Sequence, residues 1–236
     1  MIYKQIIPAL DIQDEKSLRF LVDELANEAD IVKVGMELFY SHGKLALQLL
    51  QERELKIFLD LKLHDIPNTV GKAAKTLAKS GVEILNVHAA GGVEMMKCAL
   101  DNFKTENPSG KLIGVTQLTS TSQSVMNTQL GIPGNIDDVV IRYAESVRTA
   151  GLDGVVCSAL EVKRIKSLFG SDFLCITPGI RPKGCASDDQ KRIMTPTQAL
   201  QAGSDYLVIG RAITNEKSPK IAFQKILKDT QNELDC

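Results

Sequence analysis

Eight short runs of apolar and β-branched residues recur along the chain, separated by segments with the spacing of amphipathic helices. The runs lie at 6–12, 30–36, 56–63, 83–89, 111–118, 154–159, 173–180 and 206–213. Most are apolar throughout rather than alternating, which is typical of strands buried on both faces of a parallel sheet. The pattern therefore predicts eight strands of a parallel sheet.

The segments between these runs carry the second signal, because three of them have an apolar stripe at helical spacing. The stripes are Leu18, Leu21, Val22 and Leu25, then Val139, Val140, Tyr143, Ala144 and Val147, then Val162, Ile165, Leu168 and Phe169. Three junctions also repeat a small residue, a glycine and an acid before an apolar run, at 80–87, 150–157 and 202–209. A glycine there can end a helix in the left-handed conformation before the chain enters a strand.

Eight strands that alternate with helices in 236 residues predict a compact (β/α)₈ TIM barrel. The chain shows no linker or shift in composition, so we expect residues 1–236 to form a single domain. An open doubly wound sheet is the structural alternative. Its best support would be a G-x-G-x-x-G motif after the first strand, and the sequence has none there.

Charge and composition narrow the functional classes. Lys and Arg number 28 and Asp and Glu 29, so a net charge of −1 gives no general attraction for nucleic acid or an anionic membrane. No apolar run approaches the roughly 20 residues of a membrane span, and the first residues lack the pattern of a signal peptide. We expect a cytoplasmic protein. The five cysteines are scattered and never form C-x-x-C, which favours free thiols over disulfides or zinc.

The third apolar run contains the most informative stretch, FLDLKLHDIPNT at 58–69. Asp60 and Lys62 are two residues apart, so a regular strand points both side chains to one face, while Leu59, Leu61 and Leu63 point to the other, towards the helices. The charged face is then the barrel interior. Asp65 follows the strand before a proline. Taken alone, this pattern is also consistent with a buried ion pair and an aspartate that caps a loop.

Other strands are also polar near their carboxyl ends. Asp11 follows the first, Lys33 lies on the second, His88 ends the fourth, and Thr119 and Ser120 follow the fifth. Desolvating so many groups only for structure is costly. Because barrel active sites lie at the carboxyl ends of the strands, we expect a polar pocket at that mouth.

The stretch DLKLHDIPNT resembles the D-x-K-x-x-D and I-P-x-T motif of the orotidine 5′-phosphate decarboxylase family, in its short bacterial form. Further blocks resemble the family in order along the chain: ALD at 9–11, KVGMELF at 33–39, NVHAAGG at 86–92, VTQLTS at 115–120, TPGIR at 177–181 and VIGRAI at 208–213. The resemblance implies decarboxylation of orotidine 5′-phosphate to UMP and CO₂ in de novo pyrimidine biosynthesis, with no metal and no organic cofactor.

The resemblance also implies roles for the residues of the motif. Lys62 would donate the proton to C6 of the pyrimidine, and Asp60 would lie beside the substrate carboxylate. We further hypothesise that Asp60 keeps Lys62 charged and oriented. Asp65, with Ile66 and Thr69 beside it, would reach the active site of a partner subunit, which requires a two-fold homodimer.

The remaining site residues follow from the same resemblance. The substrate-binding set it implies is Asp11, Lys33 and Thr69 for the ribose, Thr119, Ser120 and Pro178 for the pyrimidine, Gly210 and Arg211 for the phosphate, and Ile66, Arg181 and Gln190 as further substrate contacts. General barrel chemistry also favours phosphate at the loops after the seventh and eighth strands. The polar segment 181–192 is a candidate lid. His64, His88 and Cys236 receive no chemical role.

Two rival functions remain. Sugar-phosphate decarboxylases and hexulose-phosphate synthases share the D-x-K-x-x-D motif but use Mg²⁺, held in part by a glutamate near the end of the second strand. This chain has Lys33 in that region, which would repel the metal, and Glu37 lies further along. The other rival is a non-catalytic nucleotide-binding barrel in which the charged set is only an ion-pair network.

Overall fold

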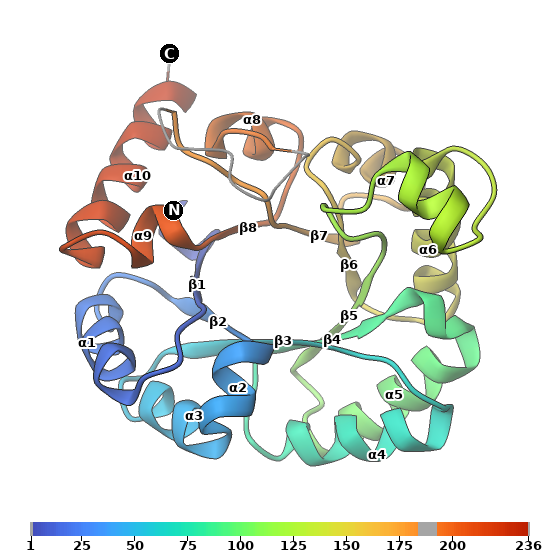
Figure 1. Cartoon of the computed structure of the whole chain (residues 1–236), viewed down its shortest axis with the longest axis horizontal. Helices are drawn as coiled ribbons and strands as arrows, with labels where there is room; N and C mark the ends of the chain where they lie inside the picture. Colours follow the sequence, from blue (N-terminus) through green and yellow to red (C-terminus); the bar gives the residue numbers. More distant parts are fainter. Residues whose placement is uncertain (1, 184–192, 236) are drawn as a thin grey trace.

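The computed structural model describes residues 2–183 and 193–235, in which eight parallel strands close into a barrel in sequence order (Figure 1). The strands are β1 (Ile6–Leu10), β2 (Ile31–Gly35), β3 (Lys56–Leu63), β4 (Ile84–His88), β5 (Lys111–Val115), β6 (Gly154–Val156), β7 (Leu174–Thr177) and β8 (Tyr206–Ile209). Each falls within one of the eight predicted runs. The predicted (β/α)₈ barrel is confirmed, because β1 pairs with β8 and leaves no open edge.

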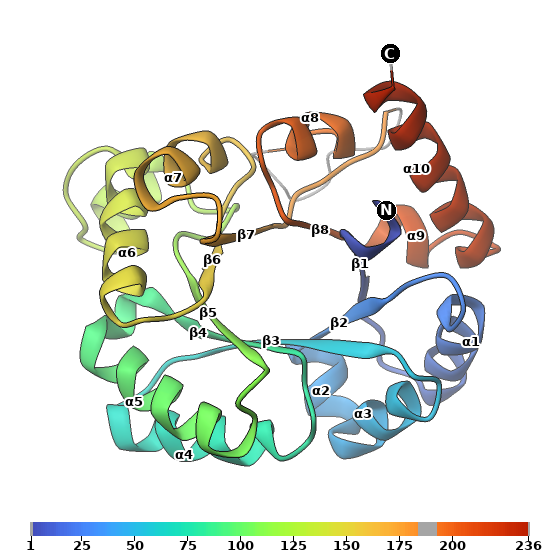
Figure 2. The same ribbon diagram turned by 180° about the vertical axis from the view of Figure 1, so that it is seen from behind.

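The helices form an outer ring around the barrel (Figures 1 and 2). They are α1 (Glu15–Leu25), α2 (Met36–His42), α3 (Lys44–Gln51), α4 (Pro67–Ala78), α5 (Gly92–Glu106), α6 (Ile136–Thr149), α7 (Val162–Phe169), α8 (Pro196–Gln201), α9 (Arg211–Thr214) and α10 (Pro219–Leu234). The short turns η1 (Ile2–Lys4), η2 (Ala89–Gly91) and η3 (Val125–Gln129) complete the described elements. None of the described helices is long and apolar enough to cross a membrane.

The predicted helical stripes form the inner faces of their helices, with one difference. α1 buries all four residues of its stripe, and α6 buries four of its five, with Tyr143 half-buried. In α7, Val162 and Ile165 are buried but Leu168 is more than half exposed. At the end of this short helix, Phe169 packs against Phe173 instead, with ring centroids 5.5 Å apart.

The apolar core has two layers because successive strand residues point to opposite faces. The larger layer lies between the barrel and its helices and includes Leu59 and Leu61. The smaller layer fills the barrel interior with Ile7, Ala9, Ile31, Phe58, Ile84, Ile113, Val115, Val156, Ile176 and Val208. Two residues beyond an inner-layer residue lie Asp11, Lys33, Asp60 and Asn86. The strands thus position a polar layer at the carboxyl end of the barrel.

β3 departs from the regular alternation that the sequence predicts. Lys62 has φ of 51°, a left-handed conformation that is uncommon for a residue other than glycine. Leu59 pairs with Leu85 and Leu63 with Val87, so β3 advances four residues while β4 advances two. β3 is therefore bulged where it carries Lys62, and the position of this side chain depends on the bulge as well as on strand parity.

The close approach of β6 and β7 gives a test of the barrel packing. A methyl group at Gly154 would collide with the carbonyl oxygen of Leu174, so we expect Gly154→Ala to lower the free energy of unfolding by about 3 kcal/mol. Gly131 has φ of 66° and nothing within 4 Å of an added methyl group, so Gly131→Ala should lose only about 1 kcal/mol through backbone strain. Urea unfolding followed by circular dichroism measures both; equal losses would contradict the steric explanation.

Candidate active site

Four charged side chains alternate in sign at the mouth of the barrel. Lys33 Nζ donates to Asp11 Oδ1 at 2.9 Å and lies 3.6 Å from Asp60 Oδ2. Lys62 Nζ donates to Asp60 Oδ1 at 2.6 Å. The exposed fraction of the side chain is 10% for Lys33, 14% for Asp60 and 27% for Lys62, against 48% for Asp11. The network therefore runs from the surface into the barrel, and its ammonium groups are brought together by carboxylates.

A fifth residue of this network, Asn86 on β4, was not singled out from the sequence. Its side chain is fully buried. Its Nδ2 donates to Asp60 Oδ1 at 2.7 Å, and its Oδ1 accepts from the backbone N–H of Lys62 at 2.7 Å. The available signal was an uncharged polar residue inside an otherwise apolar strand, because a buried amide requires partners.

Asp60 is the group on which these contacts converge. Burial on its own raises the pKa of the Asp60 carboxyl, but the charges of Lys33 and Lys62 and the hydrogen bonds from Lys62 and Asn86 outweigh it and hold the pKa below its ordinary value. The carboxylate is thus ionised at neutral pH although it is buried. It can orient the ammonium of Lys62 and provide it with a counter-charge.

The pair of Asp11 and Lys33 depends on the absence of a side chain at Gly35. A methyl group there would lie 2.7 Å from Asp11 Oδ1 and 2.8 Å from Lys33 Nζ. The described residues hold no group of three or more His, Cys, Asp or Glu side chains arranged for a metal ion. The space between Asp11 and Asp60 instead holds the ammonium of Lys33.

Two histidines stack beside this network. The rings of His64 and His88 lie 5.5 Å apart at 18°, and His88 Nδ1 accepts from the backbone N–H of Ala90 at 3.2 Å. Burial lowers the pKa of His88, and the neighbouring His64 and Lys62 lower it further. His88 is therefore a neutral acceptor at neutral pH, which leaves Nε2 as the protonated nitrogen.

The predicted site residues after β3 are exposed. Asp65 is exposed, and its Oδ1 accepts from the backbone N–H of Ile66 at 2.6 Å. Ile66 is 66% exposed, and Thr69 is exposed in the first turn of α4. In the part of the chain that the structure describes, no hydrogen bond or ion pair joins these three residues to Lys62 or Asp60, so their contribution to a partner's site stays a prediction.

The other predicted substrate contacts follow β5, β7 and β8 at the same end of the barrel. Thr119 is buried and Ser120 exposed after β5, and Pro178 is half-buried after β7. Arg181 donates through Nη1 to the carbonyl of Ile180 at 3.0 Å. Gly210 follows β8 and Arg211 begins α9. Gln190 and the rest of 184–192 lie outside the described residues.

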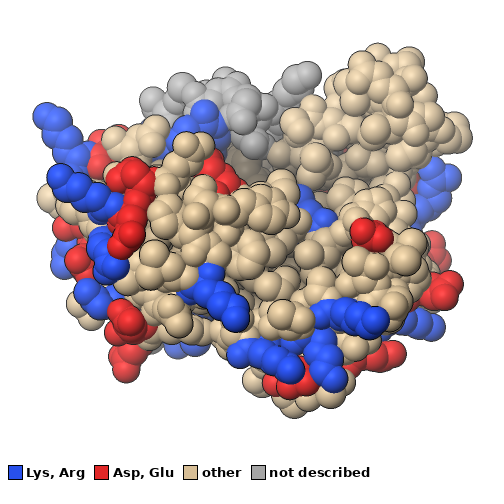
Figure 3. Space-filling view, turned by 60° about the horizontal axis from the view of Figure 1, so that its bottom comes forward, with Lys and Arg blue, Asp and Glu red and all other residues tan. Residues whose placement is uncertain are grey.

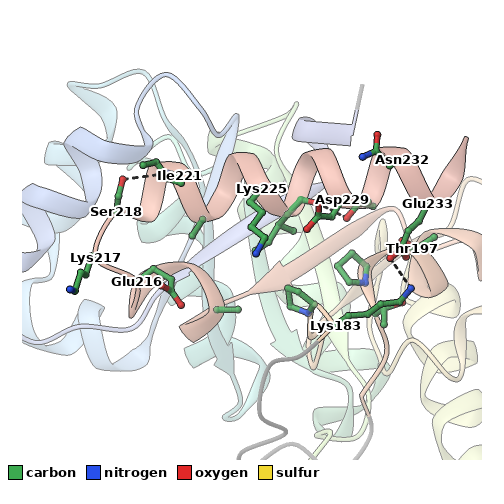
Figure 4. A pocket seen from close by; sticks show the side chains of 17 residues that line it. Lys183, Thr197, Glu216, Lys217, Ser218, Ile221, Lys225, Asp229, Asn232 and Glu233 are labelled. Atoms are coloured by element: carbon green, nitrogen blue, oxygen red, sulfur yellow. Dashed lines mark hydrogen bonds and ion pairs between the residues drawn. The ribbon is translucent and has the colours of Figure 1, made fainter.

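A cavity of about 770 Å³ lies outside the barrel, between α8, α9 and α10 (Figure 4). Of the three lysines that line it, Lys183 is paired with Glu233 at 2.8 Å, and Glu233 also accepts from Thr197. The charged network of β1–β3 does not line it. Acidic and basic side chains are also interspersed over the face that Figure 3 shows, with no field of one sign. The barrel mouth therefore remains the better candidate for the reaction.

Comparison with known proteins decides which family has this site. The model of the orotidine 5′-phosphate decarboxylase / HUMPS family matches residues 4–226. The chain belongs to this family. The family assignment made from the DLKLHDIPNT motif is confirmed, as is the enzyme class, a carboxy-lyase, at the level of the family.

Relatives named orotidine 5′-phosphate decarboxylase are similar to this chain over nearly its whole length. The protein of Staphylococcus saprophyticus is 49% identical over 93% of this chain and 95% of its own length. The protein of Staphylococcus aureus strain Mu3 is 48% identical over the same shares. The crystal structure of the Lactobacillus acidophilus protein has a TM-score of 0.85 and 40% identity, and covers 96% of this chain and 99% of its own.

The neutral state of His88 predicts a pH dependence of stability in this decarboxylase-family chain. A histidine with a lowered pKa in the folded state stabilises the fold above its unfolded pKa, and this contribution is lost as the pH falls. We expect the wild type to lose unfolding free energy relative to His88→Asn below about pH 6.5, the ordinary histidine value. Urea unfolding from pH 5 to 8 measures it.

His64→Gln provides the control, because it removes one cause of the lowered pKa and should reduce the dependence. Parallel pH curves for the wild type and His88→Asn would show that His88 does not titrate as stated.

Proposed function

We propose that this chain decarboxylates orotidine 5′-phosphate to UMP and CO₂, in de novo pyrimidine biosynthesis and in the cytoplasm. The observation that carries the proposal is the Asp11–Lys33–Asp60–Lys62 network at the barrel mouth, together with the name that relatives of 48–49% identity share. An ammonium held by a buried carboxylate suits a reaction that develops negative charge on carbon where water is excluded.

The chemical step requires a proton at C6. In it, the bond between C6 and the carboxyl carbon breaks, CO₂ leaves, and the electron pair remains at C6. Lys62 Nζ donates a proton to that carbon, which forms the C6–H bond of UMP, and solvent then returns a proton to Lys62. The 2.6 Å contact with Asp60 supports this role, because it fixes the position of the ammonium before the reaction.

We propose that the other predicted residues bind the ribose, the pyrimidine and the phosphate of the nucleotide. Asp11 and Lys33 are a carboxylate acceptor and an ammonium donor that suit the ribose hydroxyls. The segment after β5, with Thr119 and Ser120, is proposed for the pyrimidine edge, with Pro178 as an apolar wall. The loops after β7 and β8 are proposed for the phosphate, through Arg181, Gln190, Gly210 and Arg211.

Lys33 supports a reaction that needs no metal. Its ammonium lies 2.9 Å from Asp11 and 3.6 Å from Asp60, so a divalent cation between these carboxylates would meet a positive charge. The alternative, a Mg²⁺-dependent sugar-phosphate decarboxylase or synthase of the same scaffold, would need those carboxylates free. We therefore propose catalysis without a cofactor.

The test of the reaction uses the purified protein with orotidine 5′-phosphate in EDTA, and follows loss of the orotate ultraviolet band. We expect turnover in EDTA, and a fall in kcat/KM of about 10⁴-fold in Lys62→Ala, because the proton donor is lost. Lys56→Ala is the matched control. It removes a lysine from the start of the same strand, where the ammonium contacts Asp30 rather than Asp60, so kcat/KM should be unchanged.

Absence of turnover in EDTA, with activity on a sugar phosphate restored by Mg²⁺, would replace this proposal with the metal-dependent alternative. A stable wild type that binds the nucleotide without turnover would indicate the non-catalytic barrel.

We also propose a homodimer in which Asp65 and Thr69 of each subunit complete the partner's site. The exposed position of Asp65 after β3 supports this arrangement. When inactive Lys62→Ala and Asp65→Ala chains are mixed and allowed to exchange, we expect about one quarter of the wild-type activity, because half of the dimers are mixed and each has one intact site. If Asp65 serves its own chain, the mixture stays inactive.

A further inference from the structure

We infer that Asn86 is a positioning residue for the proposed reaction, fixing the backbone of Lys62 and the carboxylate of Asp60 with one buried amide. The inference rests on the proposed function for its kinetic test. Asn86 lies on β4 and its two partners on β3. Asn86 is not among the residues proposed to contact the nucleotide, so it would act through Lys62 and Asp60.

The first contact concerns the backbone of Lys62. A left-handed conformation costs about 1–2 kcal/mol for a residue with a side chain, and the pairing of β3 with β4 shifts register between Leu59 and Leu63. In this bulge the N–H of Lys62 bonds the side-chain oxygen of Asn86 at 2.7 Å. The amide oxygen therefore gives a partner to a backbone group inside the irregular stretch and helps to hold the conformation from which the ammonium projects.

The second contact concerns the carboxylate. The same Asp60 Oδ1 accepts from Asn86 Nδ2 at 2.7 Å and from Lys62 Nζ at 2.6 Å. Asp60 is thereby fixed by a neutral donor as well as by ammonium groups, and stays in place when the charge on Lys62 changes during turnover. The pKa of Asp60 is held low in part by this bond.

The two contacts determine the orientation of the amide. If oxygen and nitrogen exchanged places, a donor would face the N–H of Lys62 and an acceptor would face the carboxylate of Asp60. Only one orientation satisfies both partners, and the side chain is fully buried, so water cannot replace it. Asn86 thus links the backbone of Lys62 to the carboxylate of Asp60 across the bulge through two specific hydrogen bonds.

The chain offers a matched control at the other end of the barrel. Asn107 also bridges two backbone groups: its Nδ2 donates to the carbonyl of Val82 at 2.8 Å, and its Oδ1 accepts from the N–H of Gly110 at 2.9 Å. It contacts none of the charged network in these bonds. Asn107 is half-buried and Asn86 fully buried, so both variants should lose stability, whereas a loss of positioning should lower kcat only in Asn86 variants.

The experiment compares Asn86→Ala with Asn107→Ala and the wild type in kcat, KM and their dependence on pH. We expect Asn86→Ala to lower kcat about 100-fold with KM changed less than about threefold, because the proton donor is misplaced while the nucleotide contacts remain. The acidic limb of kcat/KM should move to higher pH, because Asp60 loses a hydrogen bond to its ionised form. Asn107→Ala should lower the melting temperature with kcat and the pH profile unchanged.

Asn86→Asp separates the two contacts. It retains an oxygen that can accept from the N–H of Lys62, but places a second carboxyl group against Asp60. The acidic limb should therefore move further than in Asn86→Ala. If Asn86→Ala does not fold, Asn86→Asp and Asn86→Ser carry the same measurements.

The inference fails if an Asn86 variant that folds keeps the kcat and the acidic limb of the wild type, or if Asn107→Ala loses kcat to the same degree. A wild type without turnover would overturn the proposed function instead. In that case the carboxyl ¹³C resonance of Asp60, assigned with Asp60→Asn, gives the pKa directly. An unchanged pKa in Asn86→Ala would then overturn the role of Asn86.

Discussion

The carboxylate of Asp60 is the interaction on which the candidate site depends. A buried ionised carboxylate is stable only if nearby groups replace the water it has lost. Here two ammonium groups and one amide do so, with Oδ1 accepting from Lys62 and Asn86 and Oδ2 facing Lys33. Lys33 lies on β2, Lys62 on β3 and Asn86 on β4, so the pairing of these strands in the barrel also assembles the network.

The polar layer depends in turn on the apolar layer beneath it. Phe58 and Ile84 fill the barrel interior, and the next residues of the same parity are Asp60 and Asn86. Because the apolar side chains fill the barrel interior below, the charged groups are confined to its mouth, where the local dielectric is low and their fields act strongly. Stability and chemistry are therefore separated along each strand.

The strands, the barrel and the shared inward face of Asp60 and Lys62 could be predicted because they follow from periodicity and from the burial of apolar runs. Family resemblance identified Lys62, but its left-handed backbone could not be predicted, since a bulge depends on how β3 meets β4 rather than on local sequence. Asn86 was missed for the same reason: its role requires partners on another strand. Leu168 was predicted to be buried, but Phe169 packs against Phe173 in its place.

The backbone at Lys62 has a consequence for sequence change in this family member. The left-handed conformation is strained for lysine and free for glycine, so a glycine at this position would relieve the strain and remove a partly buried charge. The same change would remove the proposed proton donor. Selection for a more stable chain and selection for turnover therefore favour different residues at position 62, which makes the lysine itself a marker of retained activity.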